Sequence, residues 1–505
     1  MAEIMSKEKK YDKEYLPIKD YITSLKDFKD TKTWKIPFDI RDKAHYVALS
    51  LFAKFSVFSD SLIVENPTGL TPGYALILAY LKRYRIIESF QESPTGHPGY
   101  YFFSATKSFF VNDEKVSLFG QGIAQSKNVA ISKAIGEILE RVVSGFYDLN
   151  QKMYEFSINE GVTTKKEMLN PSKVHHFLGI QKESYRELGC GNDEKIMWVK
   201  GKSLLEGKTI FIPKQMTSWF GFGKARSFNN ILIHPTSNGC AGYFTKEGAV
   251  LRGLLEVVNR DGFLVHWLTK TPPKKIDNHS LPRSIKEKIK VFNERGISLH
   301  ILDVESLGIP SVFIVAITQG EIPGISLSGS AALTYEEAIE AALDEMVMVL
   351  NLLDNEHHKN TDKRIKNFKP FISTLNMKDR PMYWRSKEKV DLFTTTFLKG
   401  KGVTFDFVSK KDLVKKSHLE DTAKIQRCIE ALSFFGDGYL PVVYFPEHPI
   451  QKVLNFFIAQ VFIERAFPLY LTEYYGNFAS ERLQEFAQYK NVSSWELNKH
   501  PHMFI

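Results

Sequence analysis

Three segments of this chain repeat one arrangement of small and acidic residues. In each segment an Ala stands seven residues before a Glu, a second small residue stands three before it, and a loop of small residues lies about four turns upstream. Positions three, four and seven apart share one face of a helix. The repeated frame therefore predicts three helices, each with a stripe of small side chains that leads to a carboxylate. The segments are residues 130–141, 249–260 and 338–348.

The carboxylates at the ends of these stripes are candidate site residues. A stripe of Ala and Gly lets a neighbouring element approach closely, and a buried carboxylate in such a junction needs a cation or a hydrogen-bond donor. Glu137 and Glu140 lie one turn apart on the first helix. On the second helix, Asn259 follows Glu256 by one turn. A single Glu-x-x-Glu-Arg helix is usually an ion-paired surface, in which Arg141 is a structural partner, but three copies in one frame favour a site.

The composition indicates a globular protein of a reducing compartment. Hydrophobic residues make up 43% of the chain, enough for a large core. The net charge of +9 is spread widely and suits a triphosphate or an acidic peptide as well as a nucleic acid, so we do not expect a nucleic-acid partner. The three cysteines lie far apart without metal-ligand spacing. A charged amino terminus and the lack of an apolar stretch of ~20 residues predict a cytoplasmic protein without a membrane segment.

The patterning divides the 505 residues into three parts. Residues 1–40 are rich in lysine and weakly patterned, and we expect a tail. Residues 41–106 are typical of two helices and a hairpin, the order of a winged-helix module, which would bind a nucleic acid or a peptide added as a strand. The alternative is a hairpin packed on helices of a larger domain. Residues 107–505 are expected to form the main domain.

Strands are expected between and after the three helices. The candidates are residues 209–212, 298–304, 311–317 and 439–445. A helix is expected to begin near Val453, and the polar stretch 356–369 is expected to be a linker or a lid. The whole pattern predicts an α+β fold with three pseudo-repeated strand-loop-helix units and an amino-terminal helix-hairpin module.

Four stretches carry a resemblance to a known family. They are Gly120-Gln121-Gly122 with residues 136–141, residues 198–204 running into Pro213, residues 236–242 with residues 256–260 and Trp267, and the closing His500-Pro501-His502-Met503-Phe504-Ile505. In their order these motifs resemble the YcaO superfamily, and within it the azoline-forming cyclodehydratase branch. The resemblance covers roughly residues 110–505 and implies that the three units surround a nucleotide cleft.

The resemblance implies an ATP- and Mg²⁺-dependent enzyme that activates peptide-backbone amides. Members hold ATP through magnesium ions on glutamates of the first two helices, which here implies Glu137, Glu140 and Glu256 as metal ligands. Asn259 and Arg260 complete the implied nucleotide site. The implied reaction closes Cys, Ser or Thr of a ribosomally made precursor peptide to a thiazoline or oxazoline. Further implied partners are a leader-peptide-binding protein, a dehydrogenase and a second copy of the chain.

The chain departs from the family pattern at several positions. Asn259 stands where the second signature usually has Glu, and Gln121 stands where the loop often has Lys. Met348 follows Glu345 in place of the usual polar pair, so Glu345 is either a site residue or a buried, paired carboxylate. The tail has lost prolines at Met503 and the carboxy terminus. These departures keep two alternatives open: a weak or inactive scaffold in a peptide-modification complex, and a thioamide- or amidine-forming enzyme.

Overall fold

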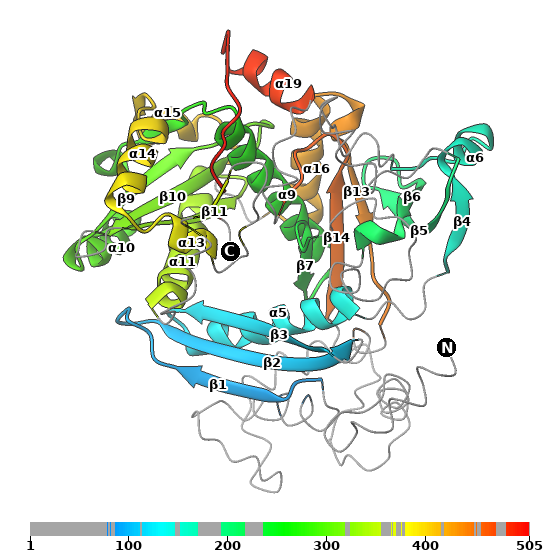
Figure 1. Cartoon of the computed structure of the whole chain (residues 1–505), viewed down its shortest axis with the longest axis horizontal. Coiled ribbons are helices and arrows are strands. Elements are labelled where there is room, and N and C mark those ends of the chain that lie inside the picture. Colours follow the sequence, from blue (N-terminus) through cyan, green and yellow to red (C-terminus); the bar gives the residue numbers. More distant parts are fainter. Residues whose placement is uncertain are drawn as a thin grey trace, which may run out of the picture.

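The computed structural model describes residues 78, 81, 86–111, 114–146, 152–169, 193–217, 236–318, 324–354, 365, 367–369, 375, 379–415, 419–448, 451, 456–470 and 481–503. Within these residues three sheets, antiparallel in all but one short strand pair, are combined with three long helices (Figure 1). The predicted α+β fold is confirmed.

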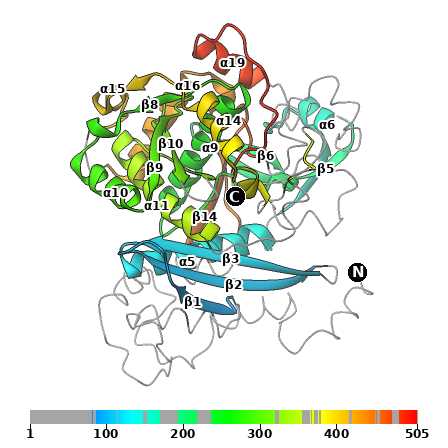
Figure 2. The same ribbon diagram turned by 60° about the vertical axis from the view of Figure 1, so that its left-hand side comes forward.

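The first sheet forms a layer of its own with one long helix against it (Figures 1 and 2). Its strands run in the order β1–β2–β3, with Gln121 of β3 opposite Ser104 of β2. Helix α5 follows β3 and buries its apolar stripe, including Ala130 and Ala134, against the sheet. The elements are β1 Ser89–Ser93, β2 Tyr101–Val111, β3 Glu114–Ala124 and α5 Lys127–Phe146.

The second sheet has the order β4–β5–β13–β14–β7, with β6 paired to β5. The central helix α9 follows β7 and packs on β7 and β14. It begins after Thr245, whose side chain accepts a hydrogen bond from Gly248 N–H at 3.0 Å. Most of α9 is buried, in keeping with its central place (Figure 1). The elements are β4 Tyr154–Ser157, β5 Lys195–Ser203, β6 Thr209–Pro213, β7 Cys240–Tyr243, α9 Lys246–Leu268, β13 Pro441–Tyr444 and β14 Phe457–Ile463.

The third sheet has the order β11–β10–β9–β8–β12. Helix α11 follows β11 and packs on β10 and β11. Both faces of β10 are covered, and Phe313, Ile314 and Val315 are fully buried. The elements are β8 Lys274–Ile276, β9 Ile297–Asp303, β10 Ser311–Thr318, β11 Gly324–Ala331, α11 Tyr335–Asp354 and β12 Gly402–Val403.

The carboxy-terminal segment is held by an aromatic cluster beside α9. Trp267 stacks on Phe397 with ring centroids 4.6 Å apart, and its indole N–H donates to the His500 carbonyl at 3.3 Å. The Trp384 indole N–H donates to the Pro501 carbonyl at 3.0 Å. The remaining helices are α6 Ile158–Thr163, α10 Arg283–Glu294, α13 Asp379–Tyr383, α14 Lys387–Phe397, α15 Phe405–Ser409, α16 Asp421–Ser433 and α19 Glu481–Tyr489.

Most expected elements are confirmed, and one is wrong. The three frame-sharing helices are α5, α9 and α11, and the four candidate strands are β6, β9, β10 and β13. The helix expected near Val453 is wrong for the described part, because Phe457–Ile463 forms strand β14 between β13 and β7. A short apolar run buried on both faces does not separate strand from helix by its periodicity.

The amino-terminal predictions are tested only at the hairpin. That hairpin is β1 with β2, and it continues into β3 of the same sheet. Of the two helices expected before it, only Leu78 and Leu81 lie within the described residues, and both are helical and buried. The division at residue 106 and the winged-helix module therefore stay predictions. Stretch 356–369 lies mostly outside the described residues. None of the described helices combines the length and apolar character needed to cross a membrane.

Candidate functional site

The three long helices and the strands before them close a ring. Each helix packs on the strand of its own unit and on the strand of the next unit: α5 on β3 and β7, α9 on β7 and β11, and α11 on β11 and β3. β3, β7 and β11 are each the outermost strand of their sheet. The ring therefore covers three sheet edges, which would otherwise expose unpaired backbone groups.

A glutamate of each helix accepts a hydrogen bond from a backbone amide at the edge strand of its own unit. The donor lies within β3 in the first unit, directly before β7 in the second, and within β11 in the third. The three pairs are Glu137 with Gln121 N–H, Glu256 with Gly239 N–H, and Glu345 with Gly329 N–H. The residue frame repeated in the sequence thus places equivalent carboxylates at equivalent points of the ring. We call Glu137, Glu140, Glu256 and Glu345 the glutamate ring.

Small residues bring the helices and edge strands close enough for the glutamates to accept these hydrogen bonds. A Cβ at Gly122 of β3 would overlap the Ala130 carbonyl of α5, and a Cβ at Gly253 of α9 would overlap the Gly239 carbonyl. Gly239 also has φ of +78°, a conformation that favours glycine. The small-residue stripe predicted from the sequence is therefore the surface on which each helix meets its edge strand.

Three charged side chains of α5 cover the free edge of β3. They stand four residues apart on one face of the helix and bind alternate residues of the strand. The Lys133 ammonium donates to the Ile123 carbonyl at 3.2 Å, and Arg141 donates to the Phe119 carbonyl at 2.6 Å. Between them Glu137 accepts from Gln121 N–H and forms an ion pair with Arg141. Arg141 is thus the structural ion-pair partner that its spacing predicted.

Glu140 lies at the junction between the first and second units. Its carboxylate accepts a hydrogen bond from Gly242 N–H of β7, the edge strand of the next unit. The neighbouring Cys240 is buried, and its thiol lies 3.1 Å from the Ser144 hydroxyl oxygen. Burial and then the Glu140 charge raise the pKa of the Cys240 thiol well above its usual value, so this thiol is not an activated nucleophile.

The carboxylates of the glutamate ring lie close enough to repel one another. Burial raises the pKa of each of its four carboxyls above the ordinary value. For Glu140, the nearby charges of Glu256 and Glu137 raise the pKa further. For Glu256, burial and the Glu345 charge outweigh Arg260 and place the pKa at about 7. Carboxyls held together against their own repulsion form a place where added positive charge is favourable.

Asn259 and Arg260 take different positions after Glu256. The Arg260 guanidinium lies 3.8 Å from the Glu256 carboxylate, so it borders the glutamate ring, and its predicted contact with the nucleotide stays a prediction. The Asn259 amide nitrogen donates to the Ser311 hydroxyl at 2.9 Å and to the Val312 carbonyl at 3.2 Å, both on β10. Asn259 therefore ties α9 to the third sheet, which leaves its Oδ1 as the atom for the predicted cofactor contact. That contact stays a prediction.

Glu345 belongs to the ring although its role was left open from the sequence. Its charge raises the pKa of Glu256, and burial raises its own pKa, against Arg260 and then Lys133. The signal was present in the shared frame, since Glu345 occupies the position of Glu137 and Glu256. Met348 stands where a polar residue is expected after it, and a role of Glu345 in binding stays a prediction.

The ring suits magnesium held together with a phosphate ligand. Its carboxylate oxygens are the hard ligands that Mg²⁺ prefers, and burial together with the neighbouring carboxylates raises the pKa of Glu140 and Glu256. Among the described residues no three acidic, His or Cys side chains come together as a metal-binding group. Mg²⁺ commonly takes one or two protein carboxylates and completes its shell with phosphate oxygens and water. The donor set fits such shared coordination.

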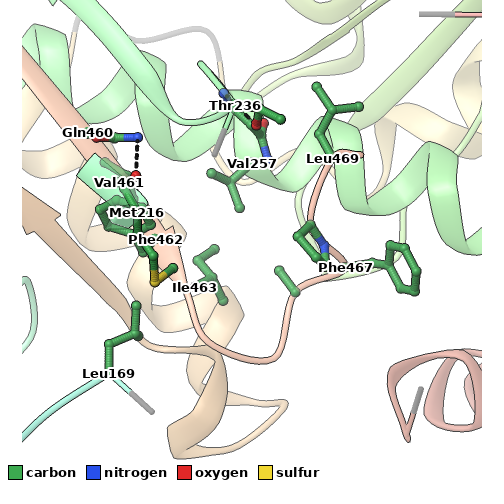
Figure 3. Close-up of a pocket in the computed structure, with 13 residues that line it drawn as sticks. Leu169, Met216, Thr236, Val257, Gln460, Val461, Phe462, Ile463, Phe467 and Leu469 are labelled. Carbon is green, nitrogen blue, oxygen red and sulfur yellow. Dashed lines mark hydrogen bonds between the residues drawn. The ribbon is translucent and has the colours of Figure 1, made fainter. Parts of the chain in front are cut away.

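A cavity of about 60 Å³ lies between parts of α9 and β14 and is too small for a nucleotide (Figure 3). Val257 of α9 and Gln460 of β14 are among its mostly apolar lining residues. The Gln460 amide donates to the Met216 carbonyl at 3.2 Å (Figure 3). This cavity holds none of the ring glutamates and is not the site that we describe.

The three long helices, their edge strands and the glutamate ring together define a repeated α+β protein with an oxygen-rich site at the junction of its units. Comparisons with known proteins agree with that class. A family model described as YcaO cyclodehydratase, ATP- and Mg²⁺-binding, matches residues 121–436. This match covers more than half of the chain, and the chain belongs to the YcaO family. ATP and Mg²⁺ are thus the cofactors of its family.

Solved structures show the same fold at low identity. A heterocyclase in complex with substrate and cofactor matches with a TM-score of 0.62 and 17% identity, over 83% of this chain and 55% of that one. YcaO from Methanopyrus kandleri bound with AMPPCP and Mg²⁺ matches with a TM-score of 0.55 and 14% identity, over 77% of this chain and 89% of that one. An uncharacterized protein in the tfuA 3′ region of Rhizobium leguminosarum bv. trifolii is 31% identical over 144 residues, which are 26% of this chain and 33% of that protein. The chain thus spans about a third of that relative and about half of the heterocyclase.

Proposed function

We propose that this chain uses ATP and Mg²⁺ to activate backbone amides of a ribosomally made precursor peptide and closes Cys, Ser or Thr to a thiazoline or oxazoline. The single observation that carries the proposal is the glutamate ring, in which four carboxylates from three units are held by backbone amides close enough to affect one another's charge. Membership of a family described as ATP- and Mg²⁺-binding cyclodehydratases gives the chemistry.

In this proposal Glu137, Glu140 and Glu256 hold the metal ions, and Glu345 joins them. Each of these carboxylates is oriented by a backbone amide of an edge strand, so its position is fixed before any ligand arrives. Arg260 borders the ring through Glu256 and would meet phosphate oxygens with its planar fork. Bound ATP supplies the phosphoryl group for the amide oxygen, and bound Mg²⁺ neutralises the charge of the phosphates.

The proposed reaction balances as one peptide and one ATP giving one azoline, ADP and phosphate. The substrate thiol or hydroxyl would add to the preceding carbonyl, and the former carbonyl oxygen would take the phosphoryl group of ATP. Loss of that oxygen as phosphate, together with the proton of the amide nitrogen, would leave the C=N bond of the ring. A leader-peptide-binding partner would present the peptide, and a dehydrogenase would oxidise the ring to a thiazole or oxazole. A homodimer is a further prediction.

The test is peptide-dependent ATP turnover. Synthetic peptides that differ only in carrying Cys, Ser, Thr or Ala at one position are incubated with the protein, ATP and Mg²⁺. Release of phosphate, together with loss of one water mass from the Cys, Ser or Thr peptide, supports the proposal. ATP turnover with loss of water from the Ala peptide contradicts ring closure by the side chain. Exchange of oxygen for sulfur only when sulfide is added contradicts ring closure and favours thioamide formation.

One observation favours a second candidate, a family member that binds partners without turnover. Asn259 stands where the family signature has Glu, and its amide is committed to β10 instead of the ring. The scaffold would keep partner binding in Glu137→Gln, whereas the enzyme would lose ATP consumption in the same variant. The two outcomes separate the candidates.

A further inference from the structure

The cations at the glutamate ring differ in how many of their donors are already used. Arg141 binds the Phe119 carbonyl and the Glu137 carboxylate. Arg260 pairs with Glu256. Lys133 instead binds a neutral carbonyl, that of Ile123, at 3.2 Å. An ammonium has three donors, and the contact of Lys133 within the described part of the chain uses one of them.

The position of Lys133 is fixed by close packing, although its side chain is exposed. A Cβ at Gly122 would lie 2.9 Å from the Lys133 Cβ, so the start of the lysine side chain rests on this glycine of β3. The bond to Ile123 then directs the ammonium along the free edge of β3. One turn further along α5 stands Glu137.

The ammonium also acts across the ring. Burial raises the pKa of Glu345 in the third unit, while Arg260 and then Lys133 lower it. α11, which carries Glu345, packs on β3, where Lys133 is anchored. Lys133 is therefore a solvent-accessible cation at the closure between the first and third units, near enough to Glu345 to affect its charge.

We propose that Lys133 binds oxygens of the polyphosphate of the nucleotide held at the glutamate ring. The inference rests on the proposed function and adds a residue that the shared frame does not contain, since the equivalent positions are Arg252 and Ala341. The alternative role is structural, with Lys133 only covering the Ile123 carbonyl at the edge of β3. Phosphate binding needs the charge of Lys133, whereas edge covering needs only a donor.

The experiment compares Lys133→Gln, which keeps an N–H donor for Ile123, with Lys133→Arg, which keeps the charge. AMPPCP and adenosine are titrated calorimetrically in the presence of Mg²⁺, and melting temperatures are measured. Lys133→Gln is expected to weaken AMPPCP binding about 10- to 100-fold, as for loss of a hydrogen bond to a charged group, with adenosine binding unchanged. Lys133→Arg is expected to restore most of the affinity. Lys127→Gln, on the same helix but paired with Glu92 at 2.9 Å, is the matched control and should bind as wild type.

The experiment distinguishes a failure of the proposed function from a failure of the Lys133 inference. Wild-type protein that binds no AMPPCP overturns the proposed function and this inference with it. Wild-type binding that is unchanged in Lys133→Gln overturns the inference alone. A lowered melting temperature with equal weakening for AMPPCP and adenosine assigns Lys133 to the edge of β3 and also overturns it.

Discussion

Helix α9 carries two carboxylates with opposite surroundings, the half-buried Glu256 and the fully buried Asp261. Asp261 is fully buried and fully paired: it accepts from Phe467 N–H at 2.7 Å, from the Ser306 hydroxyl at 2.8 Å, and from two nitrogens of Arg482. Glu256 has one amide donor at 3.2 Å, a guanidinium at 3.8 Å, and other carboxylates nearby. Burial of a charge is therefore no sign of function by itself. We expect a shortage of partners at a binding site and a complete set of partners in a structural ion pair.

The largest change in stability is expected when Asp261 is removed from its complete set of partners. Asp261→Ala leaves the Arg482 guanidinium buried without its carboxylate and should lower the free energy of unfolding by about 3–5 kcal/mol. Urea unfolding followed by circular dichroism measures this change. Glu256→Gln is the comparison on the same helix, and its stability should stay near wild type because a like charge is removed with the ion pair. A loss below about 1 kcal/mol in Asp261→Ala would contradict the structural role of the pair.

The next effect concerns the small residues that let the ring close. Gly253→Ala places a methyl group against the Gly239 carbonyl and should cost about 1–3 kcal/mol of unfolding free energy. Gly136→Ala on α5 is the matched control, because its Cβ would meet only Phe456 at 3.4 Å. The control should gain about 0.5–1 kcal/mol from helix propensity. Equal stabilisation of both variants would show that α9 is not closely packed against Gly239, the residue directly before β7.

A third effect is the pH dependence of stability, which has opposite signs for Glu256 of the glutamate ring and for the neutral, buried His266 on the same helix. Burial lowers the pKa of His266 from 6.5 to about 3, and its ring binds the Thr271 carbonyl at 2.8 Å. The unfolded state therefore takes up the proton first, so stability present above pH 6.5 is lost as the pH falls toward 3, at about 1.4 kcal/mol per pH unit. Glu256, with its pKa raised to about 7, has the opposite sign and favours folding as the pH falls below 7.

His266→Gln isolates the histidine contribution. Unfolding free energies of wild type and variant are compared between pH 7 and pH 4.5, and the wild type should lose more stability than the variant over this range. Parallel curves would mean that His266 is protonated in the folded protein.

The smallest effect is expected at Asn259, one helical turn after Glu256. Asn259→Ala removes two hydrogen bonds to β10 and should lower the unfolding free energy by about 1–2 kcal/mol. Because the amide nitrogen is committed to β10, the affinity for AMPPCP and Mg²⁺ should change less than threefold, roughly 0.6 kcal/mol. A much larger loss of affinity in calorimetry would contradict this expectation and would support the predicted contact between the Asn259 Oδ1 and the nucleotide.

The sequence was most informative where a local pattern and its environment coincide. The spacing of Ala134 and Glu137 gave the helix, its small-residue face and its carboxylate, because periodicity on a helix is a local property. The strand at Phe457–Ile463 was missed, since burial on both faces removes the alternation that marks a strand. The order of the ring and the partner of Asn259 depend on which sheet edges meet, and that is decided by packing between distant segments.

The most direct test of the glutamate ring is calorimetric titration with AMPPCP, with and without Mg²⁺, on wild type, Glu137→Gln, Glu256→Gln and Glu345→Gln. The ring has one such carboxylate in each unit, so all three variants should lose Mg²⁺-dependent binding while keeping their fold. Wild-type binding that needs no Mg²⁺, or that survives unchanged in Glu345→Gln, would contradict a site shared by the three units.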